Sequence, residues 1–222
     1  MDTSPRPVTA SSHWLSRVRE LQAMAANGLT YTTDGYDRER YRRLHAMAVE
    51  MLADLAAATP ERVAGLYLPD TGYVTPKVDV RAAVRDASGR LLFVRERSDG
   101  LWALPGGWAD VGDSPVRAAV RETAEEAGYL VEATGLVGLY DRDAERWHHP
   151  PHPYHVYKVV VACRIAGPAP RTADGGSHGE ISDVGFFAPD DLPPLSVGRN
   201  SPELVARIVE RLADPTGPAD VD

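Results

Sequence analysis

The sequence predicts an α+β protein in which a small helical domain precedes a domain built on a β-sheet. Two observations carry this prediction. Apolar residues recur every three to four positions over residues 11–68, which is typical of amphipathic helices. From about Gly72 the pattern changes to short alternating segments separated by turns, and two further helical stretches are interleaved with them. Strands interleaved with helices favour a sheet enclosed between helical layers.

The N-terminal part predicts two helices. Ser11 and Ser12 offer an N-cap for a helix over residues 13–26, and Asn27-Gly28 predicts its end. A second helix is expected over residues 37–58, where Thr59-Pro60 ends it. The expected inward stripes are Trp14, Leu15, Val18, Leu21, Met24 and Ala25 on the first helix and Tyr41, Leu44, Met47, Ala48, Met51, Leu52 and Leu55 on the second.

The second domain is expected over residues 72–213. Its predicted strands cover residues 78–85, 91–95, 136–141, 156–165 and 183–187. Ser114-Pro115 opens one helix, and Ser201-Pro202 opens a final helix that runs to about Ala213. Residues 1–10 and 214–222 are expected to be disordered tails, because they lack an apolar pattern.

Composition and charge exclude several classes of protein. The formal net charge of −8 disfavours binding to long nucleic acid, because an acidic chain repels a phosphate backbone. No apolar run approaches the length of a membrane span, and residues 1–10 lack the apolar core of a signal peptide. A lone cysteine, Cys163, cannot form an internal disulfide, which favours a reducing cytoplasmic location.

The stretch from Leu104 to Gly128 carries the chemistry. Gly106-Gly107 predicts a tight turn whose backbone can approach a ligand or a metal closely. On a regular helix, Glu122, Glu125 and Glu126 would share about a third of the circumference. Carboxylates that close repel one another unless a cation compensates them. Mg²⁺ suits this role because it prefers oxygen ligands and bridges carboxylates to phosphates.

These residues resemble the Nudix box, which is Gly-x5-Glu-x7-Arg-Glu-U-x-Glu-Glu-x-Gly-U with U an apolar residue. Here Gly107 is followed after five residues by Asp113, and after seven more by residues 121–129. Three positions depart from the box: Asp113 replaces a glutamate, while Thr123 and Tyr129 replace apolar residues. The resemblance implies an α/β/α sandwich with a mixed sheet.

The resemblance also implies a Mg²⁺ or Mn²⁺ site and roles for its residues. Glu122 and Glu126 would ligate the metal, and Glu125 would be a ligand or lie behind one. Gly106 would offer its backbone carbonyl, and Arg121 would hold Glu122 in place. Asp113 would lie behind the ligands near Arg121. Glu180, on a loop before the last strand, would be the further acid that the family often uses as ligand or general base.

Most of the chain also resembles one branch of this family, which has a short helical N-terminal domain. The resembling segments include residues 29–32, 36–41, 72–81, 140–143 and 186–187. This branch is associated with nucleoside diphosphates linked to another group, such as CDP-choline, ADP-ribose or a sugar nucleotide. The implied partner is a small-molecule nucleotide, and the apolar stripe of the helical domain suggests a homodimer.

Two further sets of residues are candidates for binding the substrate. Any of the aromatic side chains Tyr31, Tyr36, Tyr73 and Trp108 could stack on a base, although core or hinge packing is the simpler explanation for each one alone. The basic residues Lys77, Arg81 and Arg142 could contact phosphates, or could be ordinary surface charges. The His- and Pro-rich residues 148–155 favour a substrate-facing or surface loop over a zinc site, because proline spreads the rings apart.

Two alternatives remain open from the sequence. The first is an enzyme that sanitises the nucleotide pool or removes pyrophosphate from the 5′ end of RNA. The second is a sensor that binds a nucleotide without hydrolysing it. The presence of all three box glutamates and the absence of a basic recognition helix weigh against a DNA-binding regulator.

Overall fold

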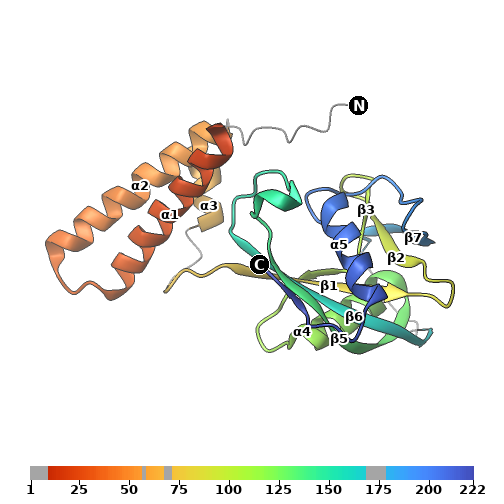
Figure 1. Cartoon of the computed structure of the whole chain (residues 1–222). Coiled ribbons are helices and arrows are strands. Elements are labelled where there is room, and N and C mark those ends of the chain that lie inside the picture. The colour runs from red at the N-terminus through yellow and green to blue at the C-terminus, as the bar shows by residue number, and fades with distance from the viewer. Residues whose placement is uncertain (1–9, 57–58, 68–71, 169–178) are drawn as a thin grey trace. The chain divides into compact units, whose positions relative to one another are not determined.

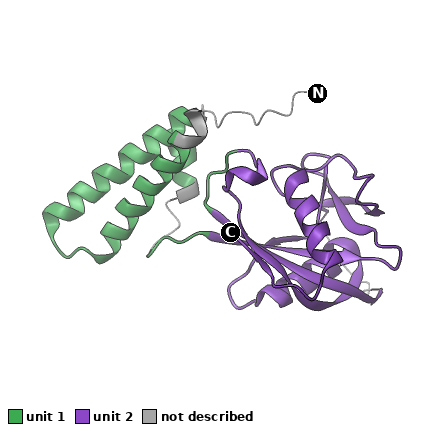
Figure 2. Cartoon of the chain, in the orientation of Figure 1, with its two compact units in different colours: residues 1–76, 151–155 green, residues 77–150, 156–222 purple. Residues whose placement is uncertain are grey.

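The protein divides into two compact units. The computed structural model describes residues 10–56, 59–67, 72–168 and 179–222 of the 222-residue chain. Residues 1–76 and 151–155 form the first unit, and residues 77–150 and 156–222 form the second (Figure 2). The expected disordered segment 1–10 lies almost entirely outside the described residues.

The N-terminal unit contains three helices, α1 (Ala10–Tyr31), α2 (Gly35–Ala56) and α3 (Pro60–Tyr67) (Figure 1). Residues 59–60 were expected only to end the second helix, but Pro60 also begins α3, because proline suits the first turn of a helix. The unit has its own apolar core, which consists of Val18, Ala48, Val49, Leu52, Ala53 and Val63.

The predicted end of the first helix at Asn27-Gly28 is wrong, because α1 continues to Tyr31. A Cβ added to Gly28 would lie 2.4 Å from a carbon of the Tyr41 ring on α2. Glycine therefore lets the two helices approach closely here. The Asn27 side chain accepts a hydrogen bond from the Val74 amide at 2.7 Å, so it fastens the segment that leads into the second unit.

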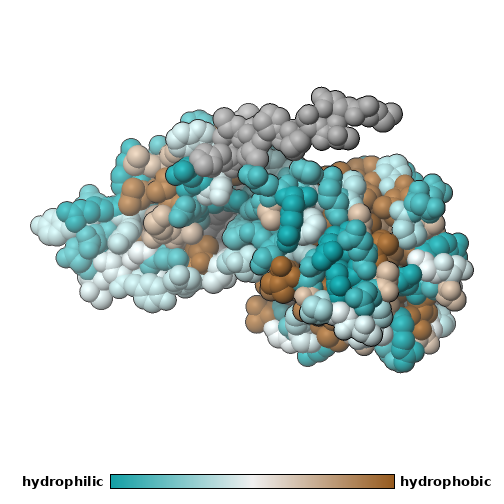
Figure 3. Space-filling model, viewed as in Figure 1, coloured by the Kyte–Doolittle hydropathy of each residue, from teal (hydrophilic) through white to brown (hydrophobic). Residues whose placement is uncertain are grey.

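Six of the thirteen residues expected on the inward stripes of these helices are exposed. Val18, Ala25 and Leu52 are buried as predicted, but Trp14 is 53% exposed and Met24 54% exposed. The other exposed members are Leu21, Leu44, Met47 and Leu55. Three helices without a covering layer enclose only a small core, so larger side chains at its margin remain on the surface. Figure 3 shows apolar side chains reaching the viewed face of this unit.

The second unit is built on a mixed sheet with the strand order β3-β2-β1-β6-β5-β8, in which β4 also pairs with β1 and β7 with β2. Strands β1 and β6 are parallel, whereas β5 and β6 are antiparallel. The strand bounds are β1 Lys77–Arg85, β2 Leu91–Glu96, β3 Trp102–Ala103, β4 Gly106–Trp108, β5 Tyr129–Asp141, β6 Val156–Pro168, β7 Ile181–Phe187 and β8 Asp220–Val221. All five predicted strands are present, and β5 begins seven residues earlier than expected, directly after Gly128.

Helices cover both faces of this sheet, as the sandwich prediction required (Figure 1). Helix α5 (Pro202–Ala213) packs on one face through Leu204, Val205 and Ile208. Helix α4 (Pro115–Glu122) packs on the other face through Ala118 and Ala119. Both begin as predicted, because the side chains of Ser114 and Ser201 accept hydrogen bonds from backbone amides three residues on.

The expected disorder of residues 214–222 is wrong. Asp220–Val221 forms β8 and pairs in parallel with β5. The carboxylate of Asp222 accepts a hydrogen bond from the Trp147 indole at 3.1 Å, and Asp220 forms an ion pair with Arg207 at 2.6 Å. These polar contacts to distant segments order a tail that has no apolar pattern of its own. Among the described helices, none combines the length and apolarity that a membrane crossing requires.

Candidate active site

The helix that carries the glutamates changes geometry along its length. After α4 the chain continues as a π-helical turn, η1 (Thr123–Ala127), which ends at Gly128 in the left-handed conformation. The sequence predicted one regular helix over these residues. A π turn places residue i beside i+5, so it rotates Glu125 and Glu126 relative to Glu122. The even spacing of 100° per residue therefore does not describe the three carboxylates.

Glu126 points toward the glycine turn. Its Oε2 accepts a hydrogen bond from the Gly106 amide at 2.9 Å. Gly106 has φ 139°, and a Cβ on it would lie 2.0 Å from the carbonyl oxygen of Val80 on the paired strand β1. Only glycine fits there, so the backbone can bring its N–H to the carboxylate. The sequence predicted a role for the carbonyl of Gly106, and the structure adds this role for its amide.

Arg121 forms ion pairs with four carboxylates around the helix. Its guanidinium lies 3.0 Å from Glu122 and 2.9 Å from Glu125. The same group reaches Asp113 at 3.3 Å and Asp110 at 3.4 Å. The shorter side chain of Asp113 therefore still contacts Arg121. One arginine thus screens four carboxylates from one another and fixes their directions.

Burial distinguishes the three glutamates. Glu125 has 44% of its side chain exposed, whereas Glu122 has 15% exposed. Burial raises the pKa of Glu126 to about 7, although the Gly106 amide and the charge of Arg81 oppose the shift. Burial also raises the pKa of Glu122. Two partly dehydrated carboxylates one helical turn apart need a positive charge, and their oxygens suit a hard divalent cation.

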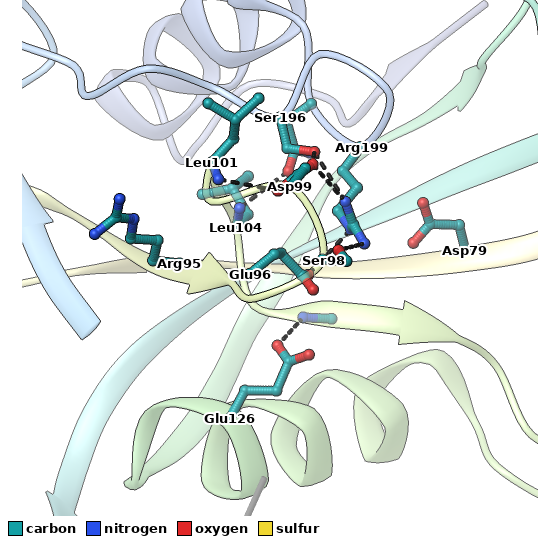
Figure 4. A network of polar contacts seen from close by, with 12 residues as sticks. Asp79, Arg95, Glu96, Ser98, Asp99, Leu101, Leu104, Glu126, Ser196 and Arg199 are labelled. Atoms are coloured by element: carbon teal, nitrogen blue, oxygen red, sulfur yellow. Dashed lines mark hydrogen bonds and ion pairs between the residues drawn. The ribbon is translucent and has the colours of Figure 1, made fainter. Parts of the chain in front are cut away.

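A second group of acids and bases lies above Glu126 (Figure 4). Glu96, at the end of β2, is buried and forms an ion pair with Arg199 at 3.0 Å. Arg199 also contacts Asp99 at 3.0 Å, and Asp99 accepts a hydrogen bond from the Ser196 hydroxyl at 2.7 Å. The charge of Glu96 adds to the raised pKa of Glu126, after the larger effect of burial. The segment 196–199 is thereby tied to the strand that faces the glutamates.

Glu180 lies directly before β7, on the exposed surface. Its carbonyl accepts a hydrogen bond from the Arg97 amide at 2.7 Å, next to Glu96 at the end of β2. Within the described ranges, no hydrogen bond or ion pair joins its carboxylate to the other glutamates. Most of the loop that precedes Glu180 lies outside the described residues, which resume at Gly179.

The predicted substrate-binding residues divide between the two units. Tyr31, Tyr36 and Tyr73 belong to the N-terminal unit and are exposed, so they are not core residues. Trp108, on β4 directly after Gly106-Gly107, is 49% exposed in the unit that holds the glutamates. Lys77 begins β1 and is partly exposed.

The expectation that Arg81 and Arg142 are ordinary surface charges is wrong. Arg81 is 6% exposed and Arg142 3% exposed. Arg81 donates to Asp79 at 2.8 Å and to the Leu104 carbonyl at 3.1 Å. Arg142 donates to the carbonyls of Pro150 and Gly198 at 2.9 and 3.3 Å. Both arginines donate hydrogen bonds to groups inside the second unit, where one guanidinium can bind several acceptors at once.

Several polar residues of the same unit were not predicted from the sequence: Asp79, Glu96, Lys158 and Asn200, which are buried, and His149 and Arg199, which are partly buried. One signal could have found two of them. Asp79 lies between two valines of β1, and Lys158 precedes a run of three valines in β6, where a charge has to face either solvent or a partner. Asn200 and Arg199 precede the cap of α5 and have no such signature.

The fold and the box together define the class of protein. A family model described as a NUDIX domain matches residues 75–208, so the chain belongs to the Nudix family of hydrolases and is a Nudix pyrophosphatase. Residues 12–67 match a second model, described as a UDP-X-like, N-terminal oligomerisation domain.

Individual relatives span both units. The chain is 38% identical over 208 residues to the Bacillus subtilis (strain 168) protein named “Putative ADP-ribose pyrophosphatase YjhB”, covering 94% of this chain and 96% of that one. A solved UDP-X diphosphatase is 30% identical with a TM-score of 0.58 and covers 96% and 99% of the two chains. An ADP-ribose pyrophosphatase from Streptococcus suis 89-1591 is 38% identical with a TM-score of 0.56, covering 67% and 100%.

Proposed function

We propose that the protein is a Mg²⁺- or Mn²⁺-dependent pyrophosphohydrolase that cleaves the diphosphate of a nucleoside diphosphate linked to another moiety. Water adds to one phosphorus while the bond from that phosphorus to the bridging oxygen breaks. The bridging oxygen leaves with the other phosphate. The products are a nucleoside monophosphate and a phosphorylated form of the second moiety, and the proton of the water passes to a base.

One observation carries this proposal: the partly buried carboxylate of Glu126 is held by the Gly106 amide, and a second partly buried carboxylate, Glu122, lies on the preceding turn. Burial of the two groups costs free energy unless a cation accompanies them. When bound, a divalent cation neutralises diphosphate oxygens and acidifies water for in-line attack. A site composed of oxygen donors around a helix suits that cation better than a soft metal.

The chain's own residues supply ligands and orientation. Glu122, Glu126 and the backbone carbonyl of Gly106 are the proposed metal ligands. Arg121 orients Glu122 and Glu125 through contacts of 3.0 and 2.9 Å, and Asp113 holds Arg121 from the other side. Glu125, which is more exposed, is proposed as an additional ligand or as the support of one.

Glu180 is the proposed acid on the substrate side. It lies beside the end of β2, next to Glu96, and its exposed carboxylate has the freedom to accept a proton from water. Trp108 follows the glycine turn and is half exposed, so it is the aromatic side chain best placed to contact a substrate near the glutamates.

The substrate class rests on the relatives. ADP-ribose and UDP-X, named for the two relatives that span almost the whole chain, are both nucleoside diphosphates linked to another group. We therefore assign this class, which includes CDP-choline, ADP-ribose and sugar nucleotides, in preference to nucleoside triphosphates or the 5′ end of RNA.

A release assay with Mg²⁺ or Mn²⁺ tests the proposal. The panel is CDP-choline, UDP- and ADP-sugars, ADP-ribose, dinucleoside polyphosphates and nucleoside triphosphates, with product analysis for the nucleoside monophosphate. We expect turnover of the linked diphosphates and its loss in Glu126→Gln, which keeps the size of the side chain. The exposed Asp183→Asn variant, on β7, is the matched control. Cleavage of triphosphates alone, or binding without turnover, would contradict the assignment.

We also infer a homodimer that forms through the N-terminal unit. The exposed apolar side chains of α1 and α2, among them Trp14, Met24 and Met47, would be stabilised by burial in a subunit interface. The family model that matches this unit describes an oligomerisation domain. Sedimentation of the full chain should give twice 24.1 kDa. A cytoplasmic location agrees with the single, buried Cys163.

A further inference from the structure

Few backbone donors hold the turn that leads into β4. Pro105 has no amide hydrogen, and the Gly106 amide donates to Glu126. The Pro105 carbonyl accepts a ladder bond from the Ala82 amide at 2.8 Å. The next position pairs Gly106 with Arg81, and there an antiparallel strand directs its amide away from its neighbour. The turn is therefore fixed to the sheet largely through its carbonyls.

Arg81 supplies the donor for the carbonyl that precedes this turn. Its Nη1 donates a hydrogen bond to the Leu104 carbonyl oxygen at 3.1 Å. Leu104 is 0% exposed, so this carbonyl depends on a donor from the protein and not on water. The Leu104 amide donates to Oδ1 of Asn200 at 2.9 Å, so the residue is held on both sides. Figure 4 shows Leu104 above the strands and Glu126 on the helix below them.

A carboxylate on the same strand fixes the direction of the Arg81 side chain. Asp79 and Arg81 are two residues apart on β1, so both lie on one face of the sheet. Asp79 accepts hydrogen bonds from Nε and Nη2 of Arg81 at 2.8 and 3.4 Å, which leaves Nη1 for Leu104. A lysine ammonium cannot reproduce this planar fork. Lys158, the register partner of Asp79 on β6, forms an ion pair with the same carboxylate.

We infer that Arg81, oriented by Asp79, is a positioning residue for the metal site. It holds the backbone at Leu104 and thereby places Gly106, whose amide binds Glu126 and whose carbonyl is a proposed metal ligand. The inference rests on the proposed function for the metal. A buried arginine can perform this role, because it acts through the backbone and does not touch a phosphate. Replacing a group that fixes metal ligands from behind typically changes metal affinity by about 10- to 100-fold.

Arg81→Lys separates position from charge. The charge of Arg81 also acts on Glu126, and lysine keeps that charge. The variant loses the fork to Asp79 and the bond that the fork directs to Leu104. We expect the dissociation constant for Mn²⁺, measured by calorimetry on the full chain, to rise about 10- to 100-fold.

Hydrogen exchange of the Gly106 amide gives a second readout that needs neither metal nor turnover. It is measured by nuclear magnetic resonance in EDTA, relative to exchange of the amide of the buried Val160 on β6, which reports unfolding of the whole unit. In Arg81→Lys the turn should open more often, so the relative exchange of Gly106 should become about tenfold faster.

Two control variants lower the stability and leave the bond from Arg81 to Leu104 in place. Lys158→Met removes one of the two cations that compensate the buried Asp79. Val84→Ala removes buried side-chain volume further along β1. Neither should change the Mn²⁺ constant or the relative exchange by more than about twofold, because neither alters the contacts of the turn.

A second comparison decides the question if Arg81→Lys does not fold. Asp79→Asn combined with Lys158→Met removes two opposite charges and nearly keeps the volume of both side chains. Relative to Lys158→Met alone, the double variant lacks only the carboxylate that orients Arg81. It should therefore weaken Mn²⁺ binding by about tenfold.

Mn²⁺ binding by Arg81→Lys that is as tight as in the parent overturns the inference. An equal loss of affinity in Val84→Ala overturns it too, because Arg81 would then act through stability alone. The proposed function falls by itself if Mn²⁺ binding follows the expected pattern but no linked diphosphate is cleaved. If Arg81→Lys cleaves linked diphosphates with the kcat/KM of the parent, the positioning role falls and the function stands.

Discussion

Glu126 should make the metal-free protein less stable as the pH rises, and Glu126→Gln should remove that effect. Burial raises the pKa of Glu126 from 4.5 to about 7 in the folded protein. A raised pKa contributes stability that is fully present below pH 4.5 and is lost as the pH rises through 7. The shift corresponds to about 3 kcal/mol at 1.36 kcal/mol per unit.

The assay is urea unfolding with EDTA at several pH values between 4.5 and 8.5. Tryptophan fluorescence reports mainly on the second unit, which contains three of the four tryptophans: Trp102, Trp108 and the buried Trp147. We expect the free energy of unfolding of Glu126→Gln, relative to that of the unmodified protein, to increase steadily with pH. The increase should be about 3 kcal/mol between pH 4.5 and 8. Glu125→Gln is the matched control on the same turn, and it should keep the loss of stability at high pH because Glu126 is still present.

Added Mg²⁺ should restore the parent at pH 8 and leave the glutamine variant almost unaffected, because the cation binds the ionised carboxylate and stabilises only the folded state. Parallel pH profiles for the parent and Glu126→Gln would refute the reasoning. They would show that Glu126 titrates alike in the folded and unfolded chains, so that burial imposes no cost for a metal to relieve.

Two further outcomes follow from the glycines. Gly106→Ala should destabilise the second unit by about 2 kcal/mol or more and abolish turnover, since its Cβ would meet the Val80 carbonyl at 2.0 Å. Gly135→Ala, where a Cβ meets nothing within 4 Å, is the control. Similar thermal unfolding of the two variants would contradict the role of Gly106. Gly28→Ala should destabilise the N-terminal unit, because its Cβ would collide with the ring of Tyr41. In a Tyr41→Ala background the same change should stabilise the unit by up to about 1 kcal/mol through helix propensity. If thermal unfolding followed by circular dichroism shows the same direction of change in both backgrounds, the ring does not crowd the glycine.

Much of the fold was predictable because its signals are local. A serine cap followed by proline placed the starts of α4 and α5, and alternation placed the strands. The errors fall where a distant contact overrides a local signal. Asn27-Gly28 looks like a helix end, yet Gly28 continues α1 because Tyr41 packs against it. The C-terminal residues look disordered, yet Asp222 binds Trp147 and Asp220 binds Arg207.

The candidate site was predictable where its residues lie close together in sequence. Arg121 contacts Glu122, Glu125 and Asp113, all within eight positions of it. The contact of Glu126 with the Gly106 amide spans 20 residues and depends on how β4 pairs with β1. Residue spacing also does not predict the π turn within the box, because this turn depends on how the end of the helix packs.

The sequence by itself determined the five longer predicted strands, the starts of α4 and α5 and the carboxylates of the box, because caps, alternation and residue spacing act over a few positions. Only the tertiary structure decided which charges are buried. Asp79 and Lys158 are 79 residues apart, and only the parallel pairing of β1 with β6 makes them partners. Asn200 and His149 acquire a defined donor and a defined acceptor from the backbone groups of Leu104 and Val197. Burial and polarity of this kind follow from packing between distant segments, which no local pattern records.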